Sequence, residues 1–541
     1  MWPFTRAAAR RAAVERIAPT VKLLPVAQQA GKRSFVSAVP TELTADLPTS
    51  IFAINAALRY NIYAMRSRSR WLARNNDYYR EWLRSLRRSV VGAKGFGLQP
   101  TVKQPPAAKA EAGAKPQPDV MANRLIRQAF DEWSGAATCT VEGSMDRPHL
   151  ERLLITLLGR DGEFLLRKVR GADVGGRFGY SLQVIPIDLL DEQLNVGVGG
   201  APPSNPGGNV GWAQDHEIRM GVQRDKWKRP FAYWLRTWYP GDDPGMAAFQ
   251  NVGRWQVVPA DEIEHVFERE DAAQARGFPR AASSITRLNQ IGGYEDAVVV
   301  GARVGASSMG FLEGQNTDEV KGDTTGAEGE LLNEVVPGTV AKLPNGVTFK
   351  SFNPSQPAST YAEGRKGFLR GVAAGMGANY HSIGKDYESV NFSSLRAAAM
   401  DDREEWKILQ DLLLDMWRRI VSDWLSHALL RGAINLPLGK FDKFNDFTLH
   451  PRGWDWVDPV AEITAAATEV ALGVKSRRQI CEARGLDFDQ IMDDQGDELR
   501  VAKSKGVDLW QPEPRLPKGV TATTPPETVA GAPKPVDPPA A

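Results

Sequence analysis

The sequence holds few of the residue patterns that carry out catalysis. Gly384-Lys385 resembles the end of a phosphate-binding loop, but Asp386 follows where Mg²⁺ coordination needs Ser or Thr, and the preceding glycine is misplaced. The stretch GASSMG at residues 305–310 is not a nucleophile elbow, because Met309 stands where that turn needs glycine. These departures argue against a P-loop ATPase and against a hydrolase of that type.

Metal-ligating residue types are equally sparse. The two cysteines, Cys139 and Cys481, are too few for a disulfide framework or a zinc site, and they indicate assembly in a reducing cytoplasm. The acidic pairs 401–402 and 493–494 are more typical of helix caps and turns than of metal sites. We therefore predict no catalytic residue, no metal and no cofactor. The six histidines are scattered and form no HExxH pair: His149, His216, His265, His381, His427 and His450.

Composition indicates a globular protein with an uneven distribution of charge. The chain has 541 residues, of which 42% are hydrophobic and 24% charged, with a net charge of +2. Residues 1–100 nevertheless hold 17 Lys and Arg against 5 Asp and Glu, which leaves 50 against 60 in the rest. This basic region suits contact with nucleic acid, an acidic protein or a neighbouring subunit, or a solvated surface.

Two features of the sequence could indicate targeting to an organelle or a membrane: the first 40 residues and the apolar runs. Residues 1–39 are rich in Arg and contain one acid, Glu15, a composition that also fits a mitochondrial transit peptide. We predict that residues 1–40 form a flexible basic arm. The best candidate for a membrane span, residues 297–312, is interrupted by Arg303 and rich in Gly and Ser, so we predict no membrane partner.

Low-complexity stretches divide the chain. Residues 104–118 are rich in Ala and Pro, residues 197–208 in Gly and Pro, and residues 314–338 in acids, Gly and Thr. We predict loops or linkers at all three, the last as a mobile insertion. Residues 511–541 hold many prolines and few large apolar side chains, which predicts a disordered tail.

Strong helical patterns lie between these stretches. Residues 72–91 carry an apolar stripe and, on another face, a basic stripe of Arg80, Arg84 and Arg88. Residues 123–133 predict a short amphipathic helix with Asn123 as a possible N-cap. Residues 148–169 are apolar enough for a buried or subunit-facing helix. The clearest helix is predicted at residues 402–430, with large apolar residues at near-heptad spacing.

Strand patterns cluster in the middle of the chain. They are short and bounded by Gly, Pro or Asp, at residues 181–189, 218–222, 231–238 and 255–258. A mainly-β region therefore lies between two helical blocks, and we predict an α+β fold.

Four segments, in the same order, resemble the lambda family of phage portal proteins. The most specific, residues 369–402, combines a small-residue helix, a polar loop and a second helix. In the first segment the matching positions are Arg74, Asn75, Asn76, Tyr78 and Val91-Gly92. In the second segment they are His265, Phe267, Arg276, Gly277, Tyr294 and Glu295. In the third segment, residues 369–402, they are Leu369, Arg370, Ala373, Ala374, Gly375, Gly377, Tyr380, Ser393 and Arg396. In the fourth segment they are Trp456, Asp458, Pro459, Gly473, Arg478, Gly485 and Asp487.

The resemblance implies a portal vertex protein: a ring of twelve subunits through which double-stranded DNA enters and leaves a phage head. It implies as partners a terminase large subunit, neck or head-completion proteins, and major capsid and scaffolding proteins. It also implies that the protein is found in the virion after assembly in the host cytoplasm.

The resemblance also implies a multi-part portal fold. Residues 41–147 and 312–365 would form the wing, 148–170 and 276–311 two stem helices, and 171–275 a β-rich clip between them. Residues 366–400 would carry the tunnel helix and loop, and 401–510 a helical crown.

Within this scheme the tunnel loop is the expected DNA contact. A channel along which DNA slides must not neutralise many phosphates, because each contact steepens the salt-dependent affinity. The candidates are Asn379, Tyr380, His381, Lys385 and Asn391, with Lys385 first. The alternative is that Lys385 pairs with Asp386 or Glu388 at a subunit contact. Small residues are expected to allow close helix approach around the ring: Ala373, Ala374, Gly375 and Gly377.

Three other functions compete with the portal interpretation. One is another head-vertex structural protein, such as a neck adaptor or minor capsid protein. Another is an enzyme of unrecognised type, targeted to an organelle through its Arg-rich start. The third, a sequence-specific DNA-binding protein, would need base readout, and the sequence has no recognisable module for that.

Overall fold

The computed structural model divides the chain by its contacts into two units, Met1–Ala56 and Ala57–Ala541, and the features that follow lie in the second, apart from the first three residues of α2. The predicted basic arm (1–40) and tail (511–541) lie outside the described residues, as do 105–116, 204–208 and much of 314–338. The structure describes residues 42, 52–104, 117–203, 211–241, 255–306, 310–314, 324–325, 331–332, 347–351, 358–388, 390–454, 459–486 and 488–507.

The first helices form the predicted apolar stripe, with a break that the sequence did not indicate. They are α2 (Ile54–Asn75), α3 (Asp77–Leu86) and a π-helical turn, η4 (Arg87–Val91). The single helix predicted over 72–91 is interrupted at Asn76, whose side chain accepts a hydrogen bond from the backbone N–H of Tyr79 and caps α3. The stripe itself is buried: Tyr79, Trp82, Leu83, Leu86 and Val90.

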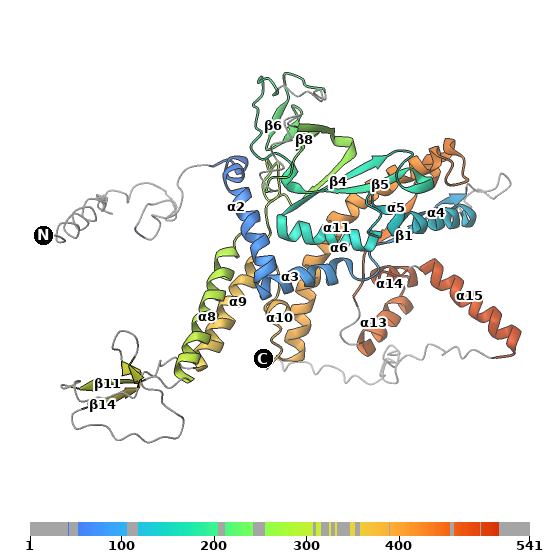
Figure 1. Cartoon of the computed structure of the whole chain (residues 1–541). Coiled ribbons are helices and arrows are strands. Elements are labelled where there is room, and N and C mark those ends of the chain that lie inside the picture. Colours follow the sequence, from blue (N-terminus) through green and yellow to red (C-terminus); the bar gives the residue numbers. More distant parts are fainter. Residues whose placement is uncertain are drawn as a thin grey trace, which may run out of the picture. The chain divides into compact units, whose positions relative to one another are not determined.

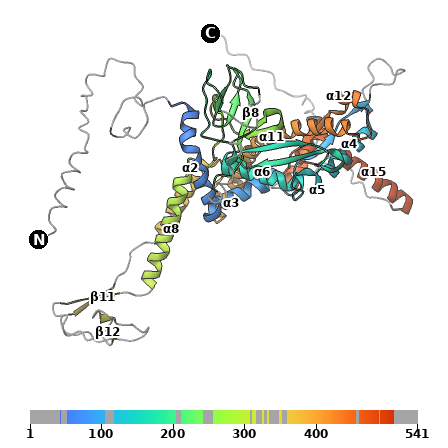
Figure 2. The same ribbon diagram turned by 45° about the horizontal axis from the view of Figure 1, so that its top comes forward.

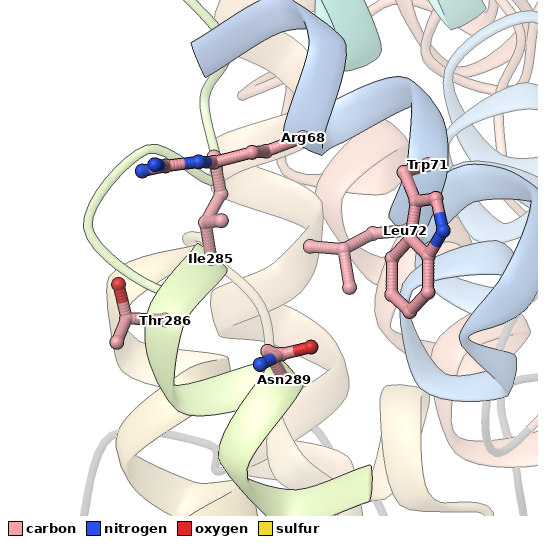
Figure 3. Close-up of a pocket in the computed structure, with 6 residues that line it drawn as sticks. All are labelled: Arg68, Trp71, Leu72, Ile285, Thr286 and Asn289. Atoms are coloured by element: carbon pink, nitrogen blue, oxygen red, sulfur yellow. The ribbon is translucent and has the colours of Figure 1, made fainter. Parts of the chain in front are cut away.

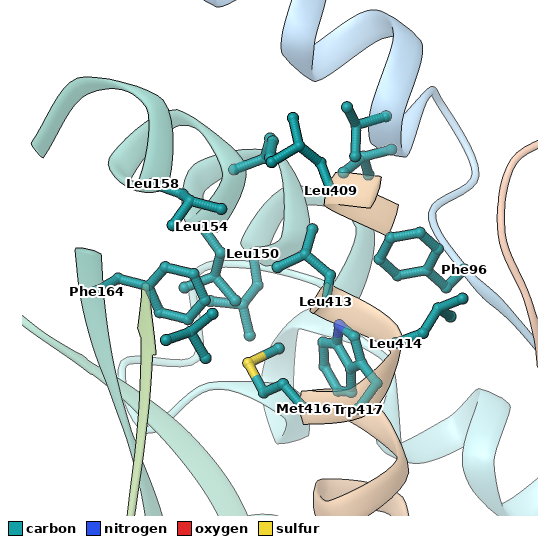
Figure 4. Close-up of a cluster of buried hydrophobic side chains, with 14 of the residues drawn as sticks. Phe96, Leu150, Leu154, Leu158, Phe164, Leu409, Leu413, Leu414, Met416 and Trp417 are labelled. Carbon is teal, nitrogen blue, oxygen red and sulfur yellow. The ribbon is translucent and has the colours of Figure 1, made fainter. Parts of the chain in front are cut away.

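The largest core lies between α6 (Arg147–Asp161) and the 39-residue helix α11 (Phe392–Leu430). α11 contains the helix predicted at 402–430 and begins earlier, at Phe392. It also packs on a three-stranded sheet (Figure 1, Figure 2). Figure 4 shows the apolar side chains that meet here, from α6 Leu150, Leu154 and Leu158, from α11 Leu409, Leu413, Met416 and Trp417, and from the sheet Phe164.

The sheet beside this core is centred on β4 (Glu163–Arg170), which pairs antiparallel with β5 (Tyr180–Ile185) and β10 (Ile263–Phe267). The helix predicted over 148–169 is therefore wrong beyond Asp161. Residues 163–166 are buried throughout and do not alternate, a pattern that fits a buried helix as well as a buried strand.

A glycine ends α6 and turns the chain into β4. Gly162 has a φ of +84°, and its N–H bonds to the Leu158 carbonyl. A Cβ on Gly162 would lie 2.0 Å from the backbone of Phe278. The close approach of the 278 segment therefore requires glycine at this position.

The middle of the chain forms a second, four-stranded sheet, which confirms the predicted β region. Its order is β6 (Glu217–Arg219), β7 (Val222–Arg224), β8 (Pro230–Arg236) and β9 (Trp255–Pro259), all antiparallel. The strand predicted over 218–222 is wrong, because Met220 and Gly221 both have positive φ and form the hairpin turn between β6 and β7.

A buried carboxylate on β4 joins α2, the outer strand β10 and residues 276–277. Glu163 accepts hydrogen bonds from Arg66, from Arg276 Nε at 2.8 Å and from the Gly277 N–H at 2.7 Å, and it pairs with His265 at 2.7 Å. Glu163 and Arg276 are fully buried. These four contacts bring together segments more than 200 positions apart in the sequence.

Two helices form an antiparallel pair, α8 (Ile285–Ala306) and α9 (Ala358–Gly375), which lie side by side in Figure 1. Ser284, just before α8, donates to the Val372 carbonyl near the end of α9, and the rings of Tyr294 and Tyr361 lie 5.9 Å apart. Two antiparallel strand pairs lie between these helices in the chain: β11 (Gly310–Gly314) with β14 (Val347–Ser351), and β12 (Thr324–Thr325) with β13 (Leu331–Leu332).

The remaining elements connect these parts. β1 (Gly97–Pro100) pairs with β15 (Phe447–His450), and β2 (Lys103–Gln104) with β3 (Gln117–Pro118). The predicted N-cap Asn123 is wrong: the helix is α4 (Val120–Trp133), capped by Asp119, and Asn123 bonds to the backbone of Val102. The others are α5 (Ala136–Cys139), η5 (Gly176–Phe178), η6 (Ile187–Leu189), η7 (Ala260–Glu262), α10 (Tyr380–Gly384), η9 (Leu438–Lys440), α12 (Phe441–Phe444), α13 (Pro459–Ala471), α14 (Arg477–Ala483) and α15 (Phe488–Lys505).

The fold as a whole is a mixture of helices and antiparallel sheets. Every pairing between named strands in the described part of the chain is antiparallel. This arrangement agrees with the predicted α+β class and differs from alternating βαβ units.

Candidate functional site

The segment singled out in the sequence folds as a helix, a short polar connection and a second helix. α9 ends at Gly375, α10 (Tyr380–Gly384) forms a single short helix, and α11 begins at Phe392. Asn391 caps α11, its side chain accepting a hydrogen bond from the Ser393 N–H at 3.3 Å. The connection between α10 and α11 is therefore held at its far end by one of the predicted DNA-contact residues.

Three more of the predicted DNA-contact residues, besides Asn391, make hydrogen bonds within the chain. The Asn379 N–H donates to Asp402 at 2.8 Å, and its side-chain amide donates to the Ala398 carbonyl. The Tyr380 hydroxyl donates to Asp386 at 2.6 Å, and the His381 ring lies 2.7 Å from the Asp386 carbonyl oxygen. These bonds fold α10 back against the start of α11 and fix the connection after it.

Asp386 is the charged centre of this connection. It accepts the Tyr380 hydroxyl and pairs with Lys366 at 3.1 Å, and these two bonds lower its pKa to about 2. Burial, together with the same bond to Asp386, raises the pKa of Tyr380 to about 12. Asp386 is therefore ionised and Tyr380 protonated at neutral pH, so their hydrogen bond persists there.

Lys385 stands apart from this network. It has a positive φ of 51°, and its ammonium pairs with Glu81 of α3 at 2.8 Å. This partner differs from the two that the sequence suggested, Asp386 and Glu388. The side chain of Lys385 is 44% exposed, so its charge remains open to solvent on one side.

The small residues at and just after the end of α9 have different surroundings. Ala373 is buried and Ala374 is exposed. A Cβ on Gly375 would lie 2.4 Å from the Ser284 hydroxyl, and one on Gly377, which has a φ of +61°, would lie 3.3 Å from Arg280 and Glu405. The two glycines therefore allow the end of α9 to approach the segment that begins α8.

The basic stripe, which runs from α3 into η4, lies next to a cavity. Arg80, Arg84 and Arg88 are all exposed, and Arg84 and Arg88 lie 3.8 Å and 3.4 Å from Glu81. Arg84 and Arg88 line a cavity of about 860 Å³, and Arg80 does not. Sequence reasoning missed the other cations of this cavity, which come from four separate segments.

A second cavity, of about 420 Å³, lies between α2 and the start of α8 (Figure 3). Arg68, Trp71 and Leu72 line it from α2, and Ile285, Thr286 and Asn289 from α8. The figure shows the Arg68 guanidinium directed away from Trp71. These six residues supply no carboxylate, imidazole or thiol, so they offer no group for acid–base or thiol chemistry.

Other reactive groups are not gathered into a site. Among the residues that the structure describes, no three His, Cys, Asp or Glu side chains are grouped as a metal ion would need. Cys139 is buried, and burial raises the pKa of its thiol to about 12, which keeps it protonated and unreactive. Within the same part of the chain, no helix is both long and apolar enough to cross a membrane.

Comparison with known proteins gives consistent matches over most of the chain. A family model described as "Phage portal protein, lambda family" matches residues 41–410. The "Probable portal protein" of Halomonas phage phiHAP-1 is 31% identical over 472 residues, which cover 86% of this chain and 85% of that protein. "Portal protein B" of Escherichia phage lambda is 22% identical, over 84% of this chain and 87% of that protein.

Solved structures resemble the chain more distantly. A chain from the virion of a native gene transfer agent particle is 13% identical, with a TM-score of 0.42, over 79% of this chain and 94% of that chain. A chain from the neck of an empty particle of the same kind is 14% identical, with a TM-score of 0.41 and the same coverage.

Proposed function

The chain belongs to the lambda family of phage portal proteins, and from this premise we propose that its copies form the ring-shaped channel through which double-stranded DNA enters and leaves a phage head. The observation that carries the proposal is the match of the family model to residues 41–410 together with 31% identity over 86% of the chain. The family is one of structural proteins, not enzymes.

The assembly that we propose is a closed ring of twelve subunits at one vertex of the head. Closing such a ring requires a head-to-tail contact, in which two different faces of each subunit fit together. The ring would assemble in the host cytoplasm and then remain in the virion. Its partners would be the terminase large subunit, neck or head-completion proteins, and the major capsid and scaffolding proteins.

We assign the stem and clip differently from the expectation drawn from sequence. That expectation placed a β-rich clip between two stem helices, 148–170 and 276–311. α6 is instead enclosed in the main core, where Leu150, Leu154 and Leu158 are at most 1% exposed. α8 and α9 form an antiparallel pair that leads into and returns from residues 307–357, so this pair supports a stem with the clip between its helices. The two sheets of residues 163–267 then belong to the wing.

The connection from α10 to α11 is the proposed channel loop. Lys385 is its exposed cation, and Asn391 is exposed at its other end. One cation per subunit gives a weak phosphate contact, and weak contacts suit a channel along which DNA must slide. Asn379, Tyr380 and His381 would support the loop from within the chain, because their bonds run to Asp386, Ala398 and Asp402. The crown would follow, from about residue 401 to 510.

The first test is the assembly state of the purified full-length protein. We expect negative-stain images with rings whose central hole admits duplex DNA, and light scattering that gives a mass close to twelve subunits. A compact monomer or dimer at all protein and salt concentrations, with or without the co-expressed scaffolding protein, would contradict the proposal.

A further inference from the structure

The cavity next to the basic stripe is lined by seven cations and eight uncharged residues. It has a volume of about 860 Å³ and is bounded by residues 84–95, 451–453 and 484–486, with Arg152 from α6. Six arginines and one lysine line it, and none of its lining residues is Asp or Glu. Four other cavities in the described part of the chain are each lined by at most three Arg or Lys residues.

The walls of the cavity are joined by specific contacts. Gln410, which is 3% exposed, donates to the Val90 carbonyl at 2.9 Å and to the Arg452 carbonyl at 3.0 Å. Trp454 donates to the Ser89 carbonyl at 3.1 Å. The segment at 451–454 is thereby fastened to η4, and the cavity between them has fixed sides.

A glycine brings the third wall into place. A Cβ on Gly453 would lie 2.2 Å from the backbone of Arg484, and no side chain tolerates that distance. Segments 451–453 and 484–486 therefore touch through their backbones, and Arg452 and Arg484 both line the cavity.

Five of the cations that line the cavity have few carboxylate partners among the residues that the structure describes: Arg84, Arg87, Arg88, Lys94 and Arg152. Arg152 donates to the Gly92 and Ala93 carbonyls at 3.1 and 2.9 Å, which positions its guanidinium but neutralises no charge. Arg84, Arg88 and Lys385 share the single carboxylate of Glu81. Arg87 and Lys94 form no ion pair with any residue that the structure describes.

We propose that this cavity binds the phosphodiester backbone of double-stranded DNA, as a second DNA contact apart from the channel loop. The inference rests on the proposed portal function. Guanidinium groups bind phosphate oxygens through paired hydrogen bonds, and several cations together neutralise several phosphates. A contact with several cations binds DNA tightly, whereas the single cation of the channel loop binds it weakly enough for the DNA to slide.

The test is the binding of a duplex of about 30 base pairs to the full-length protein, followed by fluorescence anisotropy between about 50 and 200 mM salt. The variant carries Arg87→Gln and Lys94→Gln. Neither side chain makes one of the contacts described above that hold the walls of the cavity together. We expect the affinity at low salt to fall about tenfold or more, and the slope of log K against log salt to flatten by about 2. The control carries Arg418→Gln and Lys407→Gln, which removes the same charge from solvent-exposed pairs on α11.

The outcomes separate this inference from the portal function. Rings formed by both proteins, with unchanged DNA affinity in the cavity variant, overturn the inference and leave the portal function standing. A wild-type protein that forms no ring contradicts the portal function itself. If the cavity variant loses the ring but binds the duplex as the wild type does, the cavity holds carboxylates of a neighbouring copy, and the inference is overturned.

Discussion

At the scale of single residues, the buried carboxylate of Glu163 determines how α2, β4, β10 and the 276–277 turn fit together. Burial by itself would raise the pKa of Glu163, but the attraction of Arg276 and Arg66 outweighs it and holds the pKa well below its usual range. The carboxylate is therefore ionised in the folded protein. Its removal leaves two buried guanidinium groups without their counter-charge.

We predict that Glu163→Gln destabilises the subunit by about 3–5 kcal/mol, because breaking a buried ion pair exposes an uncompensated charge to a low-dielectric surrounding. The control is Glu262→Gln, whose 2.8 Å pair with Arg167 is partly exposed and is expected to contribute about 0–1 kcal/mol. Urea unfolding of both variants measures the two free energies. If both variants lose the same free energy of unfolding, the buried ion pairs of Glu163 contribute no more to stability than the partly exposed pair of Glu262.

The same residue predicts a dependence on pH. The folded pKa of Glu163 lies far below the unfolded value of about 4.3. Its contribution is thus complete above about pH 4.3 and is lost as the pH falls below that value toward the folded pKa. The gap in melting temperature between wild type and Glu163→Gln should shrink between about pH 5 and pH 3. A gap that stays constant over this range would contradict the ionised state of Glu163.

Lys385 is predicted to act on DNA and not on the fold. Its pair with Glu81 is half exposed, so Lys385→Ala should cost less than about 1 kcal/mol and leave ring assembly intact. We expect it to alter the length or retention of packaged DNA. Glu81→Gln is the comparison variant: it breaks the same ion pair and keeps the cation, and it also removes the carboxylate that Arg84 and Arg88 contact. Two variants with the same packaging defect would mean that the pair, and not the lysine, matters.

At the scale of elements, the junction of α6 and β4 depends on one position. We predict that Gly162→Ala destabilises the subunit by well over 1 kcal/mol, because φ is +84° and the new Cβ collides with the backbone of Phe278. Gly143→Ala separates the two effects, since Gly143 also has a positive φ of 65° but no atom within 4 Å of a new Cβ. Chemical denaturation of the two variants measures the difference. Equal destabilisation would remove the steric argument.

At the scale of the whole molecule, apolar residues remain exposed on the subunit. Val299 and Val300 of α8 are 50% and 56% exposed, although an apolar helix of this kind is normally covered. In the proposed ring, a neighbouring copy would cover them.

We therefore predict that Val300→Asp lowers the fraction of ring in light scattering and negative stain at least tenfold, while circular dichroism of the subunit stays the same. Val300→Thr, which keeps the branched shape, should assemble more nearly as the wild type does. Normal rings from Val300→Asp would mean that this part of α8 faces solvent in the assembly.

Local patterns in the sequence were enough for several parts of the structure. The buried stripe of α3, the long helix α11 and the central β region follow from periodicity and turn residues, because each is decided by neighbours a few positions apart. The order of four motifs was enough for the family. The basic charge of residues 80–88 can also be predicted from the sequence alone, because it follows directly from the Arg residues present.

Only the tertiary structure decided which distant residues meet. Residues 163–166 are apolar without alternation, so their strand conformation depends on having β5 and β10 on either side. The Glu163 centre, the Lys385–Glu81 pair and the basic cavity each join segments that no local pattern relates; Gln410 bonds to a carbonyl 320 positions away. Such contacts form because the whole core packs, and a sequence window of one helix or strand holds no information about them.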